Sequence, residues 1–321
     1  MDTEVKRAYL RQKQSLPLDA KIQLAHKRIR EWFEYWDGEV YVSFSGGKDS
    51  TVLKHLVETC PGVYNVPSVF VDTGLEFPEI RKFAKSQPNV ITVRPQMRFD
   101  EVIKKYGYPV IGKRQARYIR DLQNAKGQNE ATAHLRLTGY NRAGQFCPSM
   151  KLSDKWVYLG YAPFKISEQC CDVMKKKPLK AYEKETGRKP FIGTMACESL
   201  LREQMYIRNG CNMFDAKQPK SQPMSIWTEQ DVLEYIRRNI LVYSEVYGEI
   251  VEDELGRLYT TGEQRTGCMF CMFGCHLEEN PNRFQRMKQT HPNQYAYCMR
   301  SLDEGGLGIR EVLEFIGVEY E

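Results

Sequence analysis

One stretch, VYVSFSGGKDSTVLKHL at residues 40–56, constrains the fold more than any other part of the chain. Its first half is an apolar run typical of a buried β-strand, and this run stops at Gly46 and Gly47. The residues that follow carry apolar side chains at helical spacing. A strand that passes through a tight glycine turn into a helix is the repeating unit of sheets built from parallel strands.

The alternation of strand and helix continues beyond this unit. Further apolar runs of strand type begin at Ser68, Val90 and Pro190, and helix-like stretches at residues 77–87 and 99–106 lie between some of them. This order favours an α/β architecture with a twisted, Rossmann-like parallel sheet and helices on both faces.

We expect the chain to divide into three consecutive segments. Residues 1–36 combine many charges with an apolar helical pattern and predict N-terminal helices. Residues 37–215 hold the α/β domain, and residues 216–321 form a helical, cysteine-rich segment packed on it. In this last segment Thr228 is expected to cap a helix, with Asp231 at the third helical position.

The composition limits the class of protein. With 321 residues, of which 41% are hydrophobic, the chain can bury a sizeable core. It begins MDTEVKRAYL, without an apolar leader, and it has no run of the roughly 18 apolar residues that a membrane span needs, so we expect a cytoplasmic protein that does not contact a membrane. A net charge of +6 allows an anionic ligand but does not require a nucleic acid. The ten cysteines favour metal or redox chemistry over a disulfide framework.

The glycine turn is the first candidate for a binding site. In a parallel sheet, ligands gather beyond the carboxyl ends of the strands, where backbone N–H groups and a helix N-terminus favour phosphate. A pair of glycines alone could simply make a tight turn, but Lys48 and the flanking serines favour anion binding. The spacing is neither that of a Walker loop nor that of the dinucleotide fingerprint.

The motif SGGKDS resembles the PP-loop of the adenine-nucleotide alpha-hydrolase superfamily. DTGLEFPEI at residues 72–80, GTMACESLLRE at 193–203 and the stretch 221–247 resemble the phosphoadenosine phosphosulfate (PAPS) and adenylyl sulfate (APS) reductase family within it. The resemblance implies phosphate-binding positions at Ser45, Gly46, Gly47, Lys48, Asp49 and Ser50. It also implies nucleotide-binding positions at Asp72, Thr73, Gly74, Gly193, Glu198, Ser199 and Arg202. Met195 stands where the family usually has arginine, which weakens the case that this segment neutralises a phosphate or sulfate.

The cysteines predict a metal site. Cys268 and Cys271 form a Cys-x-x-Cys pair, and Cys170 and Cys171 are adjacent, an arrangement better suited to separate iron corners of a cluster than to one zinc ion. The pattern resembles the 4Fe-4S site of the APS-reducing branch, which implies these four cysteines as ligands. Two alternatives stay open: a cluster with three ligands and one open iron, or a zinc knuckle made by Cys268, Cys271, Cys275 and His276.

The resemblance implies an enzyme, and two chemistries are known in the family. Reductases use a cysteine thiolate to attack the sulfur of a sulfonucleotide, and a thioredoxin-type reductant then releases sulfite. ATP-using relatives let an acceptor oxygen attack the α-phosphate, release pyrophosphate and replace the activated oxygen, with Mg²⁺ assisting. The reductase nucleophile lies in a C-terminal cysteine motif that this chain lacks, and its last thiol is Cys298. The candidate catalytic residues are Lys48, Asp49 and Cys298.

Three hypotheses follow from these observations. The leading one is a PP-loop enzyme with an iron-sulfur cluster that uses ATP to adenylate or thiolate an acceptor, with a protein as sulfur donor. The second is an APS or PAPS reductase, with Cys298, Cys275 or Cys147 as nucleophile. The third is a nucleotide-binding regulatory subunit with a structural metal. The sequence leaves the acceptor and the oligomeric state open.

The segment at residues 112–142 adds a nucleic acid to the candidate partners. It is basic, it places Arg114 and Arg117 on one helical face, and it carries Tyr118 and Tyr140 for base stacking. A solvated helix or a lid that closes over the nucleotide would explain the same pattern.

Overall fold

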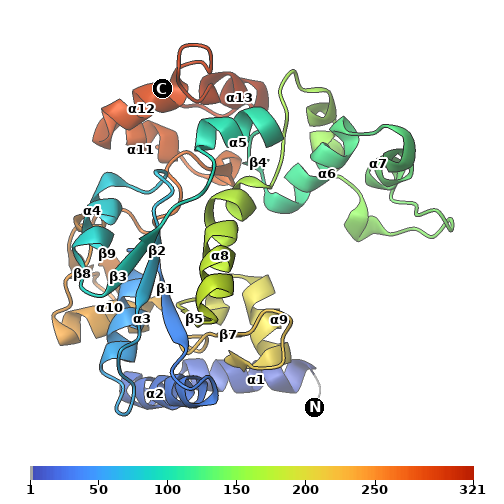
Figure 1. Cartoon of the computed structure of the whole chain (residues 1–321). Helices are drawn as coiled ribbons and strands as arrows, with labels where there is room; N and C mark the ends of the chain where they lie inside the picture. Colours follow the sequence, from blue (N-terminus) through green and yellow to red (C-terminus); the bar gives the residue numbers. More distant parts are fainter. Residues whose placement is uncertain (1–2) are drawn as a thin grey trace. The chain divides into compact units, whose positions relative to one another are not determined.

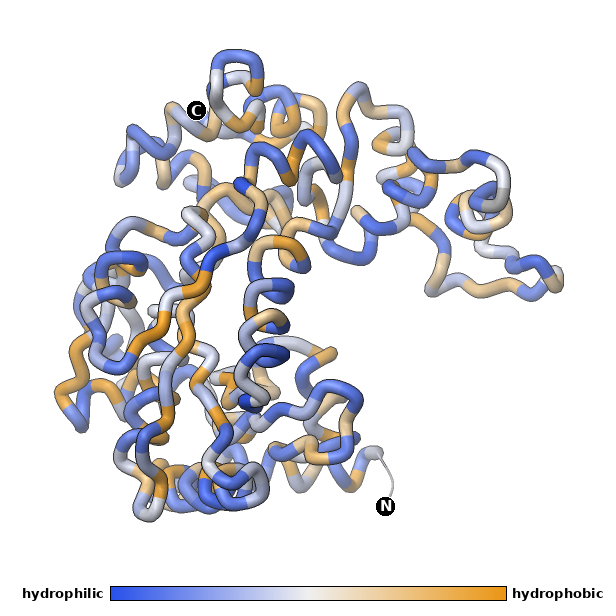
Figure 2. Tube along the Cα trace, in the orientation of Figure 1, coloured by the Kyte–Doolittle hydropathy of each residue, from blue (hydrophilic) through white to orange (hydrophobic). Residues whose placement is uncertain are grey.

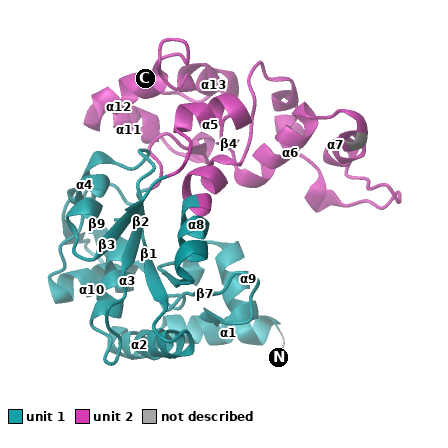
Figure 3. Cartoon of the chain, viewed as in Figure 1, with its two compact units in different colours: residues 1–94, 178–266 teal, residues 95–177, 267–321 magenta. Residues whose placement is uncertain are grey.

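The structure, a computed structural model, describes residues 3–321 (Figure 1). It contains two compact units, each made from two separate stretches of the chain (Figure 3). Unit 1 comprises the residues up to Arg94 together with Pro178–Thr266, and unit 2 comprises Pro95–Lys177 together with Gly267–Glu321. The three consecutive segments expected from the sequence remain a prediction.

Unit 1 contains the expected sheet. Its six strands run in the order β3-β2-β1-β5-β7-β6. Every neighbouring pair is parallel except β6 and β7, which are antiparallel. The strands are β1 (Val40–Phe44), β2 (Ser68–Val71), β3 (Val90–Val93), β5 (Lys189–Ile192), β6 (Asn212–Met213) and β7 (Lys220–Ser221). The predicted α/β class with a mostly parallel sheet is confirmed.

Helices cover both faces of this sheet, and the alternating side chains of β1 pack against both layers. Val42 belongs to the large core with Trp32 and Leu53, whereas Tyr41 points to a second cluster with Tyr182. Figure 2 shows the apolar colouring concentrated along these central strands. The helices of unit 1 are α1 (Thr3–Gln14), α2 (Leu18–Tyr35), α3 (Lys48–Glu58), α4 (Pro78–Ser86), α9 (Leu200–Asn209), α10 (Glu229–Asn239) and nearly all of α8 (Lys177–Thr186).

A buried ion pair joins the N-terminal helices to α10. Lys21 on α2 donates to both carboxylate oxygens of Asp231, at 2.8 and 2.7 Å. Asp231 also accepts hydrogen bonds from the backbone N–H and the hydroxyl of Thr228, and the predicted cap at Thr228 is present. Beyond α10, unit 1 continues with the short helix η6 (Glu245–Tyr247) and the hairpin of β8 (Ile250–Glu252) and β9 (Leu258–Thr260).

Unit 2 is mainly helical. A short parallel pair, β4 (Val110–Ile111) with β10 (Met272–Phe273), joins its two stretches of chain. Its α-helices are α5 (Phe99–Tyr106), α6 (Lys113–Gln123), α7 (Glu130–Thr138), α11 (Arg283–Thr290), α12 (Pro292–Met299) and α13 (Ile309–Ile316). Its short helices are η1 (Gly127–Asn129), η2 (Pro148–Met150), η3 (Asp154–Tyr161), η4 (Asp172–Lys176) and η7 (Cys275–Leu277). Across residues 3–321, every helix is too short or too polar to cross a bilayer.

Candidate functional site

The glycine turn lies between β1 and α3, as the sequence predicts. Gly46 has a φ of +75°, and a Cβ there would lie 3.0 Å from the backbone oxygen of Ile80, so this position requires glycine. The hydroxyls of Ser45 and Ser50 are 2.9 Å apart and close the turn across its base. The turn delivers the chain into α3, whose first residue is Lys48. This geometry places a helix N-terminus at the carboxyl end of a central parallel strand, where an anion is favoured.

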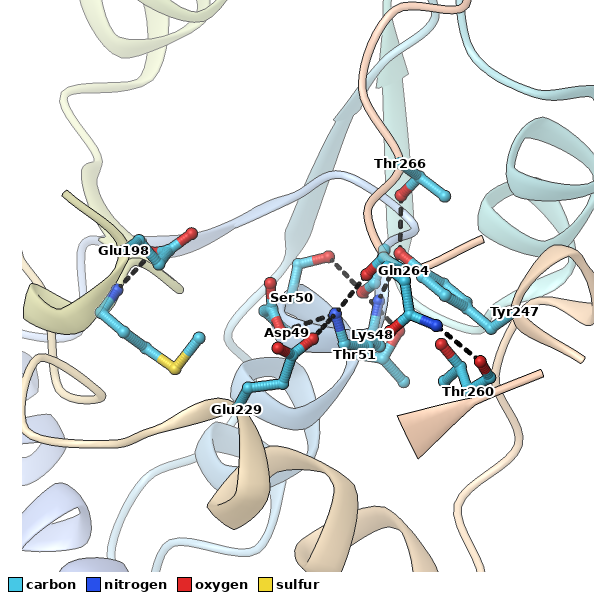
Figure 4. Close-up of polar contacts among 12 residues, drawn as sticks. Lys48, Asp49, Ser50, Thr51, Glu198, Glu229, Tyr247, Thr260, Gln264 and Thr266 are labelled. Carbon is cyan, nitrogen blue, oxygen red and sulfur yellow. Dashed lines mark hydrogen bonds and ion pairs between the residues drawn. The ribbon is translucent and has the colours of Figure 1, made fainter. Parts of the chain in front are cut away.

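Lys48 is the central charge of the site. The residue is only 4% exposed, yet its ammonium donates to the backbone oxygen of Gln264 at 2.9 Å and lies 3.1 Å from Glu229 Oε1. Figure 4 shows these contacts converging at the start of α3. Because Gln264 and Glu229 come from distant parts of unit 1, the folded chain holds the ammonium in a fixed place beside the turn.

Tyr247 is a contact that sequence reasoning missed. Its hydroxyl accepts a hydrogen bond from the backbone N–H of Lys48 at 3.1 Å and lies 2.6 Å from the hydroxyl of Thr266 (Figure 4). Burial raises the pKa of Tyr247 to about 12, so the phenol is neutral and can act as donor or acceptor at the turn. The sequence placed Tyr247 in a family-like stretch, but no local pattern revealed its contact with a residue about 200 positions earlier.

Asp49 shares this environment with two other carboxylates. Burial raises its pKa, the charge of Lys48 opposes that shift, and Glu198 and Glu229 raise it further. Its buried Oδ1 accepts no hydrogen bond from any residue that the structure describes, and Lys48 Nζ lies 3.9 Å away. A carboxylate in this position is chemically suited to share a hard cation with a phosphate.

Asp72 and its neighbours follow β2. The Asp72 side chain is 1% exposed and is held by Arg81 at 2.7 Å and by Lys85 at 2.7 Å. Burial alone would raise the pKa of Asp72, but the hydrogen bonds from these two cations outweigh it and lower the pKa. Asp72 is therefore a buried ion-paired carboxylate. Thr73 donates to Glu76 at 2.7 Å, and Gly74 adopts a φ of +73° with open space around it. The nucleotide contacts expected of these three residues remain a prediction.

The segment at residues 193–202 lies beside the glycine turn, and the approach is made by its first residue, Gly193. A Cβ on Gly193 would lie 3.2 Å from the backbone oxygen of Asp49. Ser199 caps α9 by accepting from the N–H of Arg202, while Glu198 accepts from the N–H of Met195 and pairs with the Arg202 guanidinium. These contacts order the segment beside the turn. Whether its residues touch a nucleotide remains a prediction.

The cysteines lie in unit 2. Cys170 Sγ is 4.0 Å from Cys171 Sγ and donates to it. That hydrogen bond, helped by the charges of Lys113 and Lys175, lowers the pKa of Cys171 to about 6. The same hydrogen bond and burial raise the pKa of Cys170.

The Cys-x-x-Cys pair belongs to the same neighbourhood. The charges of Cys171, Cys271 and Cys268 all contribute to raising the pKa of Cys170. Burial raises the pKa of Cys271, and the nearby Arg283 opposes that rise. The thiols of Cys171, Cys268 and Cys271 therefore lie close enough to Cys170 in the folded unit to affect its pKa.

No group of three or more His, Cys, Asp or Glu side chains in residues 3–321 is arranged to hold a metal ion. This arrangement supports neither the zinc knuckle nor the iron-sulfur cluster considered from the sequence, and both remain predictions. Cys275 is buried and donates to the backbone oxygen of Met272 at 3.1 Å, and burial raises its pKa to about 12. His276 packs its ring edge-on against Trp156.

Cys298 is fully buried on α12, and burial raises its pKa. A thiol needs access and a lowered pKa to act as a nucleophile. The environment of Cys298 provides neither, so this structure argues against the nucleophilic role considered for it.

Tyr118, expected from the sequence to stack on bases, is buried, and Arg136 covers its ring at 4.0 Å. Its ring is therefore not available for base stacking, contrary to expectation.

A lysine-headed helix that follows a Ser-Gly-Gly turn on a parallel sheet defines a PP-loop protein of the adenine-nucleotide alpha-hydrolase superfamily. The family model described as "Phosphoadenosine phosphosulfate reductase domain" matches residues 39–136 and 130–275, and the chain belongs to this family. Fifteen solved chains match it significantly. One is a phosphoadenylyl-sulfate (PAPS) reductase from Candida auris in a phosphate complex, with 16% sequence identity and a TM-score of 0.39. That match covers 76% of this chain and 98% of the other. No curated protein is a significant match.

Proposed function

We propose that this chain is an enzyme that binds ATP at the Ser45–Ser50 turn and uses it to activate an acceptor for sulfur transfer. The observation that carries the proposal is the placement of Lys48. Its buried ammonium stands at the N-terminus of α3, beside the backbone N–H groups of the turn. Such a cation and helix terminus favour the negative charge that gathers on a phosphate during group transfer.

The reaction would proceed in two displacements. An acceptor oxygen attacks the α-phosphorus of ATP, the bond from phosphorus to the bridging oxygen breaks, and pyrophosphate leaves. Hydrosulfide released by a donor protein then attacks the carbon that carries the adenylated oxygen, the C–S bond forms, the C–O bond breaks, and AMP leaves with the oxygen. Lys48 would stabilise the charge on the phosphates in the first step. The neutral Tyr247 phenol would stabilise the start of α3 by accepting from the backbone N–H of Lys48.

Mg²⁺ fits the carboxylates beside this lysine. Magnesium is usually bound by one or two carboxylates together with substrate phosphates rather than by a complete protein cage. Asp49 supplies an oxygen that accepts no hydrogen bond from the described residues, and Glu198 and Glu229 lie close enough to influence its pKa. When bound, Mg²⁺ would neutralise part of the triphosphate charge.

The sequence pattern of adjacent cysteines followed by a distant Cys-x-x-Cys pair is what supports a 4Fe-4S cluster in unit 2. Two thiols 4.0 Å apart and two others within electrostatic range supply four sulfur ligands, yet no three of them surround one ion. A cluster binds its thiolates on separate irons, and nearby cations such as Lys113 and Arg283 would balance its charge. We therefore propose Cys170, Cys171, Cys268 and Cys271 as its ligands, and the cluster would supply electron transfer or a site for sulfur.

A sulfonucleotide reductase is the second candidate, and the description of the family favours it. The burial of Cys298 argues against that residue as the nucleophile, and burial of Cys275 does the same. Cys147, which is half-buried, remains as a candidate for this chemistry. A thioredoxin-type protein would then be the reductant. A regulatory subunit that binds a nucleotide without turning it over is the third candidate.

Titration calorimetry with anaerobically purified protein tests the proposal. ATP with Mg²⁺, APS and PAPS are titrated separately, and we expect ATP to bind most tightly. Iron and acid-labile sulfide are measured in the same sample, and we expect both. Preference for APS or PAPS would support the reductase instead, and zinc without sulfide would remove the cluster.

A further inference from the structure

Residues 137–161 of unit 2 carry an unusual set of exposed apolar side chains. Six large hydrophobic residues in this segment are exposed: Leu137, Tyr140, Phe146, Met150, Tyr158 and Tyr161. We call this segment the aromatic arm. It begins in the last turn of α7 and continues beyond that helix, and Figure 1 draws most of it in green. Clusters of exposed apolar side chains on this scale mark interaction surfaces.

We propose that the aromatic arm and the adjoining face of α6 bind single-stranded nucleic acid. The bases would stack on the exposed rings, and the phosphates would contact the arginines of α6 and of the arm. This inference goes beyond the proposed function, because it concerns a surface of unit 2 alone and does not require nucleotide binding at Lys48.

The tip of the arm is a hairpin held by hydrogen bonds. The backbone N–H of Asn141 donates to the oxygen of Gln145 at 3.0 Å, and the N–H of Cys147 donates to the oxygen of Gly139 at 2.7 Å. The side-chain oxygen of Asn141 accepts from the N–H groups of Ala143 and Gln145. Because the turn satisfies its own polar groups, the rings beside it are held in place before a ligand arrives.

Two of these rings form a prepared stacking surface. The rings of Tyr140 and Phe146 lie 5.1 Å apart, although Tyr140 is 48% exposed and Phe146 is 57% exposed. Phe146 rests on Gly139, where a Cβ would lie 2.7 Å from the ring and where φ is +83°. Only glycine allows the ring to sit this close to the backbone. The hairpin therefore fixes an aromatic surface that the fold itself leaves uncovered.

The stretch of unit 2 that carries this surface is basic. Residues 95–177 contain 16 Lys and Arg against seven Asp and Glu, although the whole chain has a net charge of only +6. Arg114 and Arg117 are exposed on α6, and Arg142 is exposed at the tip of the hairpin. Among the side chains that the structure describes, none pairs or hydrogen-bonds with these three guanidinium groups, so each can contact a phosphate without losing a described contact.

Hydrogen bonds connect α6 to the aromatic arm. Tyr118 on α6 donates to the backbone oxygen of Ser149 at 3.0 Å, and the N–H of Ser153 donates to Gln115 at 3.3 Å. The basic face and the arm therefore belong to one surface. Single strands combine free base faces with a charged backbone, whereas the bases of a duplex are already stacked. Exposed rings beside unpaired arginines match the single strand better than a duplex or a neutral protein surface.

Fluorescence anisotropy with labelled oligo(dT) and oligo(U) of 20 nucleotides, in the absence of ATP, tests this inference. The wild-type protein should bind both more tightly than a duplex of the same length. The double variant Tyr140→Ala/Phe146→Ala should bind about tenfold or more weakly, given the energies typical of base stacking. Arg114→Glu/Arg117→Glu should also bind more weakly, and the slope of log K against log salt should fall by about 1.4.

Lys104→Glu/Lys105→Glu is the matched control, because it makes the same charge change on α5 of the same unit. It should bind nearly as the wild type does. ATP binding and the thermal melting temperature of each variant show whether it remains folded. Absence of binding to single strands, equal binding to the duplex, or equal loss in the control would each overturn the inference. The last two results would indicate attraction to charge alone.

Discussion

Replacing Lys48 by methionine tests the PP-loop directly. Methionine keeps most of the apolar stem of lysine and removes the ammonium that contacts Gln264 and Glu229. If this ammonium binds the phosphates of a nucleotide, the variant should lose affinity for ATP while the turn itself stays intact.

The structure sets the size of the effect. Opposite unit charges about 4 Å apart attract by roughly 4 kcal/mol at the effective dielectric constant found near protein surfaces. Lys48 already interacts with a carboxylate and a carbonyl oxygen, so binding exchanges one set of contacts for another, and we take about half of this value. A loss of about 2 kcal/mol corresponds to roughly 30-fold weaker binding.

Lys54→Met is the matched control for this change. Lys54 lies on the same helix, is equally buried and is paired with Glu58, but it stands away from the N-terminus of α3. Calorimetric titration with ATP should give about 30-fold weaker binding for Lys48→Met and less than about twofold for Lys54→Met. Binding by Lys48→Met within threefold of the wild type, about 0.7 kcal/mol, would refute the role of the ammonium.

Three further predictions concern the fold and the cysteines. Lys21→Met should lower the free energy of unfolding by about 3–5 kcal/mol in urea titrations, because it leaves the buried charge of Asp231 unpaired; a loss below about 1 kcal/mol would contradict this. In metal-free protein, the rate of alkylation of Cys171 should rise with pH around a midpoint of about 6 and level off above it, because the pKa of this thiol is lowered and the thiolate is the form that reacts. A midpoint near pH 9 would show an ordinary thiol and contradict the prediction. Gly107→Ala should lower the free energy of unfolding by about 2–4 kcal/mol, because φ at this position is +106° and the new Cβ would overlap the backbone of Lys165. Gly112→Ala, which has open space around the new Cβ, should change the stability little. Equal melting temperatures for the two variants would disprove the argument.

The local pattern of the chain predicted the elements around the turn. The apolar run at residues 40–44 is a strand, Gly46 takes the left-handed conformation, and a helix begins at Lys48. The helix expected at residues 99–106 has those bounds. Each of these features depends on periodicity, glycine chemistry or capping over a few residues, and such signals are present in the sequence itself.

The parts that were missed depend on contacts between distant segments. The pairing of β4 with β10 joins Val110 to Met272, and the contact of Tyr247 with Lys48 spans a similar distance in the chain. No periodicity reports which distant segment will pack against an element. Tyr118 was misjudged for the same reason, since Arg136 and Ser149 bury it in the folded unit.

The measurement that tests the central claim most directly is product analysis with anaerobically purified protein of known iron and sulfide content. The protein is given APS or PAPS with a thiol reductant, and sulfite is measured over time. Our account predicts no sulfite beyond background, because the thiols of Cys275 and Cys298 are buried and the activation is assigned to ATP. Sulfite at catalytic turnover would contradict that assignment and identify the chain as a reductase.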